Sequence, residues 1–181
     1  MIRAFRLCKT KHLATAFTGE GARLNGGRWN SPGNSVVYAS SSLSLATLEV
    51  LVHLEDPEAF TRLFSWVAVE IPHDTVETVN PSTLASGWNH DESGPVSRAV
   101  GDAWLRSMRS ATLAVPSVVT PGEWNYLLNP AHSHFPRVQI GPFQRFRPDP
   151  RCCTEYTVFV TAKGTEIVTL SEKNRDLVST F

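Results

Sequence analysis

Gly26-Gly27-Arg28-Trp29-Asn30 lies within a stretch, residues 18–34, that is rich in glycine, asparagine and serine. This composition is typical of a long loop, and a long loop in a compact domain is often functional. Glycine lets a ligand approach the backbone closely, and the planar guanidinium of arginine fits phosphate oxygens. Arg28 is therefore a candidate anion-binding residue, although a surface arginine stacked on Trp29 would give the same sequence.

Other familiar signatures are missing from the sequence. The glycines near residue 26 match neither a GxGxxG fingerprint nor a P-loop, so we expect no nucleotide held in the Rossmann or Walker manner. Serine, histidine and aspartate occur without a GxSxG elbow, so nothing indicates a hydrolase triad. His132 and His134 have a possible metal-ligand spacing but no accompanying acidic or cysteine cluster, so a polar loop is the better interpretation.

The segment after the glycine-rich loop predicts a strand and then a helix. Val36-Val37-Tyr38-Ala39 is short and apolar, as in a buried strand. Tyr38 either packs there with its hydroxyl outward or offers an aromatic platform to a flat heterocycle. Ser42 or Ser44 can cap a helix that runs to about Leu54.

Glu49 occupies an informative place on that helix. At helical spacing, Leu45, Leu48 and Val52 form the expected buried stripe, and Glu49 falls near its edge. A carboxylate at the edge of an apolar face costs free energy unless it is paired or hydrogen-bonded. Either Glu49 pairs with His53 one turn later, at the rim of the core, or its carboxylate faces a cleft.

The rest of the chain alternates between strands and one further helix. Ser117 follows Pro116 in an apolar strand, where it either bonds nearby backbone or supplies a hydroxyl to a site. The pattern favours one mixed α/β domain, with a central twisted β-sheet and flanking helices, over residues 1–150. Residues 151–181 form a C-terminal extension that we expect to pack on the same domain. Strands are predicted at residues 2–7, 64–71, 113–119, 124–128, 138–143, 154–162 and 165–170, and a helix at 96–109.

Composition limits the classes of function. Seventeen basic residues balance seventeen acidic ones, which argues against a general electrostatic hold on nucleic acid but leaves a local basic patch open. No apolar run approaches the roughly 18 residues that span a bilayer, and residues 1–7 lack the apolar core of a signal peptide. Three cysteines (8, 152 and 153) without CxxC spacing suit a reducing compartment and give no metal framework, so we expect a cytoplasmic protein.

Taken in order, six segments of the chain resemble the RES-domain family, named for its Arg, Glu and Ser. The resemblance covers about residues 2–150. The segments are Gly26-Gly27-Arg28-Trp29-Asn30, Val36-Val37-Tyr38-Ala39-Ser40, Leu45-Ala46-Thr47-Leu48-Glu49-Val50-Leu51-Val52-His53, Gly101-Asp102-Ala103-Trp104-Leu105, Val115-Pro116-Ser117-Val118-Val119 and Asn125-Tyr126-Leu127-Leu128-Asn129-Pro130-Ala131-His132. The sequence departs from the family pattern at Ser133, where a proline is expected, and in continuing past Arg151.

The resemblance implies a fold like that of the ADP-ribosyltransferases of the diphtheria-toxin kind, and a site that takes NAD⁺ as substrate without a metal. By position, the core of the site would be Arg28, Tyr38, Glu49 and Ser117, and supporting ligand contacts would come from Arg6 and Asn125. Arg28 would hold the pyrophosphate and Tyr38 would stack on nicotinamide. Glu49 would bond the ribose hydroxyls, and Ser117 would position the nicotinamide amide or a ribose hydroxyl.

The family further implies the toxin of a bacterial toxin–antitoxin pair, whose antitoxin carries an Xre-type helix-turn-helix. The expected reaction cleaves the nicotinamide–ribose bond, as an NAD⁺ glycohydrolase or phosphorylase. One alternative is an ADP-ribosyltransferase that modifies a specific protein acceptor, and a remoter one is an inactive domain that binds only a nucleotide or an antitoxin. We expect no membrane partner and no direct binding of nucleic acid.

Overall fold

The computed structural model describes residues 1–54, 63–90, 94–149, 156–161 and 164–169. Its larger sheet contains β1 (Ile2–Lys9), β2 (Val37–Ser40), β3 (Phe64–Ile71), β4 (Val76–Thr78), β5 (Thr112–Pro116), β6 (Trp124–Leu128), β7 (Gln139–Ile140) and β8 (Gln144–Arg145). The helices are α1 (Glu20–Asn25), α2 (Leu43–Leu51) and α4 (Gly94–Ser107), with short 3₁₀ turns at Thr10–Thr15, His73–Thr75, Pro81–Thr83 and Phe135–Arg137. Two further strands, β9 (Tyr156–Thr161) and β10 (Gly164–Thr169), pair with each other.

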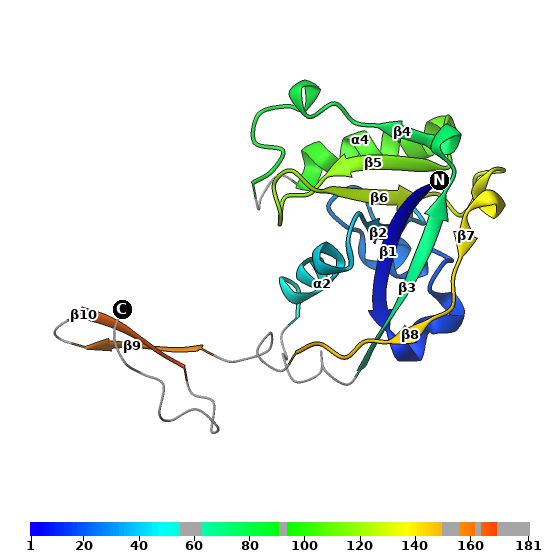
Figure 1. Ribbon diagram of the computed structural model, residues 1–181. Coiled ribbons are helices and arrows are strands. Elements are labelled where there is room, and N and C mark those ends of the chain that lie inside the picture. Colours follow the sequence, from blue (N-terminus) through cyan, green and yellow to red (C-terminus); the bar gives the residue numbers. More distant parts are fainter. Residues whose placement is uncertain (55–62, 91–93, 150–155, 162–163, 170–181) are drawn as a thin grey trace.

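The larger sheet runs in the order β4-β5-β6-β2-β1-β3-β7, and β8 also pairs with β3. All neighbours are antiparallel except the parallel pair β4 and β5. In Figure 1, β5 and β6 run across the view whereas β1 and β3 run steeply down it. This change of direction shows a strong twist between two halves of the sheet. One half contains β4, β5, β6 and β2, and the other contains β1, β3, β7 and β8.

The two halves meet at β1 and β2, which are paired only at Phe5 and Ser40. In contrast, β1 pairs along its whole length with β3, and β2 pairs along its whole length with β6. Ser40 is the last residue of β2, so the two strands diverge from this register position, as β1 continues through Arg6 and β2 leads back through Ala39. This divergence matters for the site described below.

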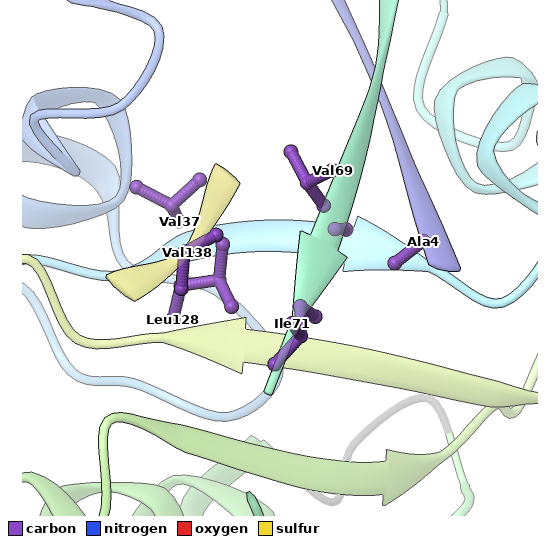
Figure 2. Packing of buried hydrophobic residues seen from close by; sticks show 7 residues of the cluster. Ala4, Val37, Val69, Ile71, Leu128 and Val138 are labelled. Carbon is purple, nitrogen blue, oxygen red and sulfur yellow. The ribbon is translucent and has the colours of Figure 1, made fainter. Parts of the chain in front are cut away.

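Buried aliphatic side chains hold the two halves together. One cluster draws on β1, β2, β3 and β6 and on the turn before β7, as Figure 2 shows. Its members alternate along the strands because successive side chains point to opposite faces of a sheet. The buried residues of this cluster are Ala4, Val37, Ala39, Val69, Ile71, Leu128 and Val138.

Helix α2 lies against the half of the sheet that contains β1 and β3. Ser42 caps the helix by accepting a hydrogen bond from the backbone N–H of Leu45, which confirms one of the two predicted caps. Leu45 and Ala46 are buried, but Leu48 and Val52 are 41% and 57% exposed. The predicted stripe was therefore wrong beyond Leu45, because α2 turns the Ala46 face toward β1 and β3 instead.

Helix α4 belongs to the other half of the sheet and packs against β5, β6 and the glycine-rich loop. Trp104 and Leu113 are buried in this second cluster together with Trp29. Gly101 lies so close to the loop that an added Cβ would approach the carbonyl oxygen of Trp29 to 1.8 Å. The helix and the loop therefore form one packed unit.

The structure confirms a mixed α/β fold with a twisted central sheet, and most predicted strands and both predicted helices. Residues 18–34 were predicted as loop throughout, but residues 20–25 form α1, which an ion pair between Glu20 and Arg23 stabilises. The strand predicted at 113–119 ends at Pro116, and that at 138–143 is reduced to β7. No helix among the described residues is long and apolar enough to cross a bilayer.

Candidate active site

A cavity of about 680 Å³ opens where β1 and β2 diverge. This volume is typical of sites for small molecules. Its walls come from β1, the segment 15–28, β2, α2, the start of α4, and β6. The polar and charged lining residues are Arg6, Thr15, Glu20, Asn25, Arg28, Tyr38, Ser40, Glu49, His53, Arg98 and Asn125.

Glu49 lies on α2 and lines this cavity, held by neutral donors from two other segments. Its Oε1 accepts hydrogen bonds from Ser117 Oγ at 2.9 Å and from Asn125 Nδ2 at 2.6 Å. Within the part of the chain that is described, Oε2 accepts no hydrogen bond, and His53 makes no ion pair with the carboxylate. One oxygen is therefore fixed while the other remains available to a ligand, so the cleft-facing interpretation of Glu49 is the better one.

The two donors to Glu49 are themselves fixed. Ser117 is 5% exposed and accepts a hydrogen bond from the backbone N–H of Thr120 at 3.1 Å, which leaves its own proton for Glu49. Asn125 accepts a hydrogen bond from Ser40 Oγ at 2.7 Å, which directs its amide N–H₂ to the carboxylate. Ser117 follows the end of β5 and is not part of the cavity wall, so it contacts Glu49 from behind.

Tyr38 presents its ring to the cavity while its hydroxyl is occupied by the glycine-rich loop. The hydroxyl donates to Asn30 Oδ1 at 2.7 Å and accepts from the backbone N–H of Trp29 at 3.2 Å. Burial raises the pKa of the Tyr38 phenol well above its ordinary value, so the phenol is neutral near pH 7. These contacts suit a fixed aromatic wall and leave the hydroxyl no proton-transfer role.

Arg6 lies on β1 at the point where this strand leaves β2. Its Nη1 donates to the carbonyl oxygen of Tyr38 at 2.7 Å, and its buried Nε has no partner among the described residues. Burial lowers the pKa of the guanidinium and the nearby Cys8 raises it, but arginine stays charged near neutral pH. Arg6 therefore places a positive charge in the wall of the cavity.

Arg28 and Arg98 add positive charge to the parts of the wall formed by the glycine-rich loop and the start of α4. The guanidinium of Arg28 reaches the carbonyl oxygens of Trp88 and His90, at 3.5 and 3.3 Å. Its neighbour Trp29 is 2% exposed and packs on Trp88, with 5.8 Å between ring centroids. Trp29 is thus a core residue that packs on Trp88.

Asn30 explains why the loop holds its shape. It is fully buried, and its Nδ2 lies within hydrogen-bond distance of the carbonyl oxygens of Ala22, Ser31 and Asn34. Asp102 on α4 accepts from the Ser31 backbone N–H and from Asn34 Nδ2. Burial raises the pKa of Asp102, but these hydrogen bonds outweigh burial and lower it.

The structure thus brings five residues predicted for the site to the cavity wall and places the sixth, Ser117, directly behind Glu49. Two residues of the site, Ser40 and Arg98, were not singled out from the sequence. Arg98 is four residues after Gly94 and three before Gly101, so helical spacing places it on the face where α4 approaches the loop. No cluster of three or more His, Cys, Asp or Glu with metal-binding geometry occurs among the described residues.

Comparison with known proteins identifies the family of the chain. The family model described as the RES domain matches residues 3–149. The chain belongs to the RES domain family. The RES match spans every residue of the site, from Arg6 to Asn125.

Curated relatives of this RES chain are named as toxins. It is 38% identical over 131 residues to "Toxin Res" of Photorhabdus laumondii, a match that covers 72% of this chain and 83% of the relative. It is also 38% identical over 141 residues to the "Prs ADP-ribosylating toxin" of a Sphingobium species, covering 76% of this chain and 87% of the relative.

A solved structure shares the fold of this RES chain. It is a chain in the crystal structure of the M. tuberculosis MbcT–MbcA toxin–antitoxin complex, with a TM-score of 0.65 and 18% sequence identity. The match covers 81% of this chain and 84% of that chain.

Proposed function

We propose that this RES chain is the toxin of a toxin–antitoxin pair and that it cleaves the nicotinamide–ribose bond of NAD⁺. The observation that carries the proposal is the Glu49 carboxylate, fixed through one oxygen in a cavity that also contains three arginines and a tyrosine ring. Anionic phosphates need cations, a flat base needs an aromatic wall, and a developing ribose cation needs a carboxylate. The names of the relatives support the toxin assignment.

The proposed reaction breaks the bond between ribose C1′ and the nicotinamide nitrogen. The electron pair of the bond returns to the nitrogen, so nicotinamide leaves as a neutral molecule and requires no strong acid. Positive charge develops on the ribose, as in other glycosyl transfers. Glu49 Oε2 would contact the ribose and stabilise this charge.

Ser117 and Asn125 then act through Glu49. Their hydrogen bonds hold Oε1 in place, so the carboxylate need not reorganise as the ribose becomes cationic. Ser117 was predicted to position the nicotinamide amide or a ribose hydroxyl. Its place behind Glu49 favours the role of a positioning residue instead.

Water or phosphate would complete the reaction by attacking C1′, with water losing a proton as its oxygen bonds to carbon. A protein side chain would take the same place in an ADP-ribosyltransferase, an alternative supported by the name of the Sphingobium relative. We further propose an antitoxin partner with an Xre-type helix-turn-helix and action in the cytoplasm. The toxin–antitoxin complex of the structural neighbour supports the existence of a partner.

Substitution of Glu49 tests the reaction. In purified Glu49→Gln, we expect nicotinamide release from NAD⁺ to fall at least about 100-fold because the negative charge is lost, while the melting temperature changes little. The matched control is Glu77→Gln, which removes a carboxylate that is bonded to Arg109 and lies outside the cavity wall. Equal turnover by Glu49→Gln and wild type would refute the proposal.

Product analysis separates the alternatives for the acceptor. ADP-ribose as the product indicates hydrolysis, and ADP-ribose 1″-phosphate formed only in phosphate buffer indicates phosphorolysis. A discrete modified protein, found by mass spectrometry of expressing cells, indicates transfer. Wild-type protein that binds NAD⁺ without turning it over would favour the inactive binding domain.

A further inference from the structure

Arg98 is the charged residue of the cavity for which the sequence provided no role. It lies in the second turn of α4, and it lines the cavity together with Gly94 and Arg28. Its Nε donates to the carbonyl oxygen of Gly27 at 2.9 Å. The contact joins α4 to the glycine-rich loop directly beside Arg28.

The remaining guanidinium edge of Arg98 is available to a ligand. Neither terminal nitrogen has a hydrogen-bond partner within the described part of the chain. A Cβ added at Gly94 would lie 3.2 Å from Cζ and 3.4 Å from Nη2 of Arg98, so the missing side chain at Gly94 makes room for the guanidinium. Because Nε is bonded to the loop, the orientation of the fork is fixed before any ligand binds.

The loop that Arg98 holds is the one that supplies Arg28. The carbonyl of Arg28 accepts from Ser97 Oγ at 2.6 Å, next to the contact between Arg98 and Gly27. Two consecutive residues of α4 thus fix two consecutive carbonyls of the loop. Arg98 and the aromatic wall formed by Tyr38 line the same cavity. Burial raises the pKa of the Tyr38 phenol, and the positive charge of Arg98 opposes that rise.

We propose that Arg98 is a second phosphate-binding residue, which binds the diphosphate of the dinucleotide with its terminal nitrogens while Nε holds the loop of Arg28. The inference rests on the proposed function, because it assigns a residue to the diphosphate part of the same substrate. A diphosphate carries two negative phosphate groups, and two arginines with separate forks match both. Arg98 is therefore a binding residue, distinct from the chemical role of Glu49.

The test compares two ligands that differ only in phosphate. Calorimetry on the full chain measures the binding of ADP and of adenosine to wild type and to Arg98→Ala. We expect the substitution to weaken the binding of ADP about 10- to 100-fold and to leave the affinity for adenosine within about 3-fold of wild type. Arg98→Lys keeps the charge but not the fork, so its affinity for ADP should lie between that of wild type and that of Arg98→Ala.

Arg106→Ala is the matched control, since Arg106 is exposed on the same helix and outside the cavity wall. It should bind both ligands like wild type. Unchanged ADP affinity in Arg98→Ala would overturn the inference, as would equal losses for ADP and adenosine or a wild type that binds no ADP. If Arg98→Ala unfolds, the ADP-to-adenosine ratio of Arg98→Lys decides instead, and an unchanged ratio overturns the inference.

Kinetics separates this inference from the proposed function. With NAD⁺ as substrate, Arg98→Ala should raise KM by the same factor by which it weakens the binding of ADP. Its kcat should stay within about 3-fold of wild type. Absence of nicotinamide release by wild type would refute the proposed reaction. The ADP and adenosine titrations would then still decide whether Arg98 binds phosphate.

Discussion

Glu49 and Ser117 are separated by 68 positions in the sequence, yet they share one hydrogen bond of 2.9 Å at the base of the cavity. Ser117 donates to Glu49 while the backbone of Thr120 donates to Ser117, so the hydroxyl has a single orientation. A fixed hydroxyl that contacts the carboxylate from behind can influence the reaction only through the carboxylate. This arrangement leads to a kinetic prediction.

Ser117→Ala removes one of the two hydrogen bonds to Oε1. We expect kcat for NAD⁺ to fall about 10-fold, the value of one such bond, with KM nearly unchanged. In a protein that already carries Glu49→Gln, the same substitution should lower kcat little further, because the carboxylate through which Ser117 acts is gone. Labelled NAD⁺ gives the sensitivity for both measurements. A full 10-fold loss in both backgrounds would show that Ser117 touches the substrate itself.

The sequence could predict part of this site at the level of residues. Glu49 was recognisable because a carboxylate at the edge of an apolar helix face requires a partner, and its partners proved to be Ser117 and Asn125 rather than His53. Ser117 was singled out as a hydroxyl after Pro116, and the resemblance added it to the core of the site. Its contact with Glu49 was not predictable because it depends on packing between segments far apart in the chain. Arg98 was overlooked since a single arginine on an amphipathic helix is usually a solvated residue.

At the level of elements, α4 and the glycine-rich loop depend on each other. Gly101 allows the helix to lie directly against the carbonyl of Trp29, while Ser97 and Arg98 bond the two residues before it. The loop in turn bonds the hydroxyl of Tyr38 through Asn30. A change in the packing of α4 should therefore reach the cavity.

Gly101→Ala tests this dependence. An added Cβ would stand 1.8 Å from the Trp29 oxygen, so we expect the free energy of unfolding in urea to fall by about 3 kcal/mol. Gly21→Ala is the control, because a Cβ on this helical glycine would meet nothing within 4 Å. That variant should be neutral or up to about 1 kcal/mol more stable. Equal stability of the two variants would contradict the close packing of α4 on the loop.

Elements with a strong pattern were predictable, and elements that depend on long-range pairing were not. Strands β1, β3 and β6 and helix α4 lie within about two residues of their predicted bounds. The short strands β4 and β8 have no recognisable alternation, and they exist because β5 and β3 offer them hydrogen bonds. Helix α1 was hidden by its glycine and asparagine, although Gly19 and Gly26, both with positive φ, mark its two ends.

At the scale of the whole molecule, the family match ends at residue 149 and the chain continues to Phe181. All the residues assigned to the site precede that point. The division into a RES domain over residues 1–150 and an extension over 151–181 remains a prediction, and much of the extension lies outside the described residues. The expectation that the extension packs on the domain can be tested directly.

A chain of residues 1–150 should keep nicotinamide release within about 3-fold of the full chain, because it retains the whole site. If the extension packs on the domain and contributes about 1 kcal/mol, the melting temperature should fall by about 2–4 °C on its removal. Calorimetric scans of both chains measure the difference. An identical melting temperature would show that the extension adds nothing to the stability of the domain.

The single pairing of Phe5 with Ser40 has a consequence for the energetics of binding. One half of the sheet carries Arg6, while the other carries Tyr38 and Asn125, and the cavity lies across the seam between them. Because main-chain pairing joins the halves at only one position, the seam is held mainly by side chains: the shared aliphatic cluster and the hydrogen bond from Arg6 to the carbonyl of Tyr38. A ligand that contacts both sides acts as a further cross-link, so its binding should stabilise the seam against local opening.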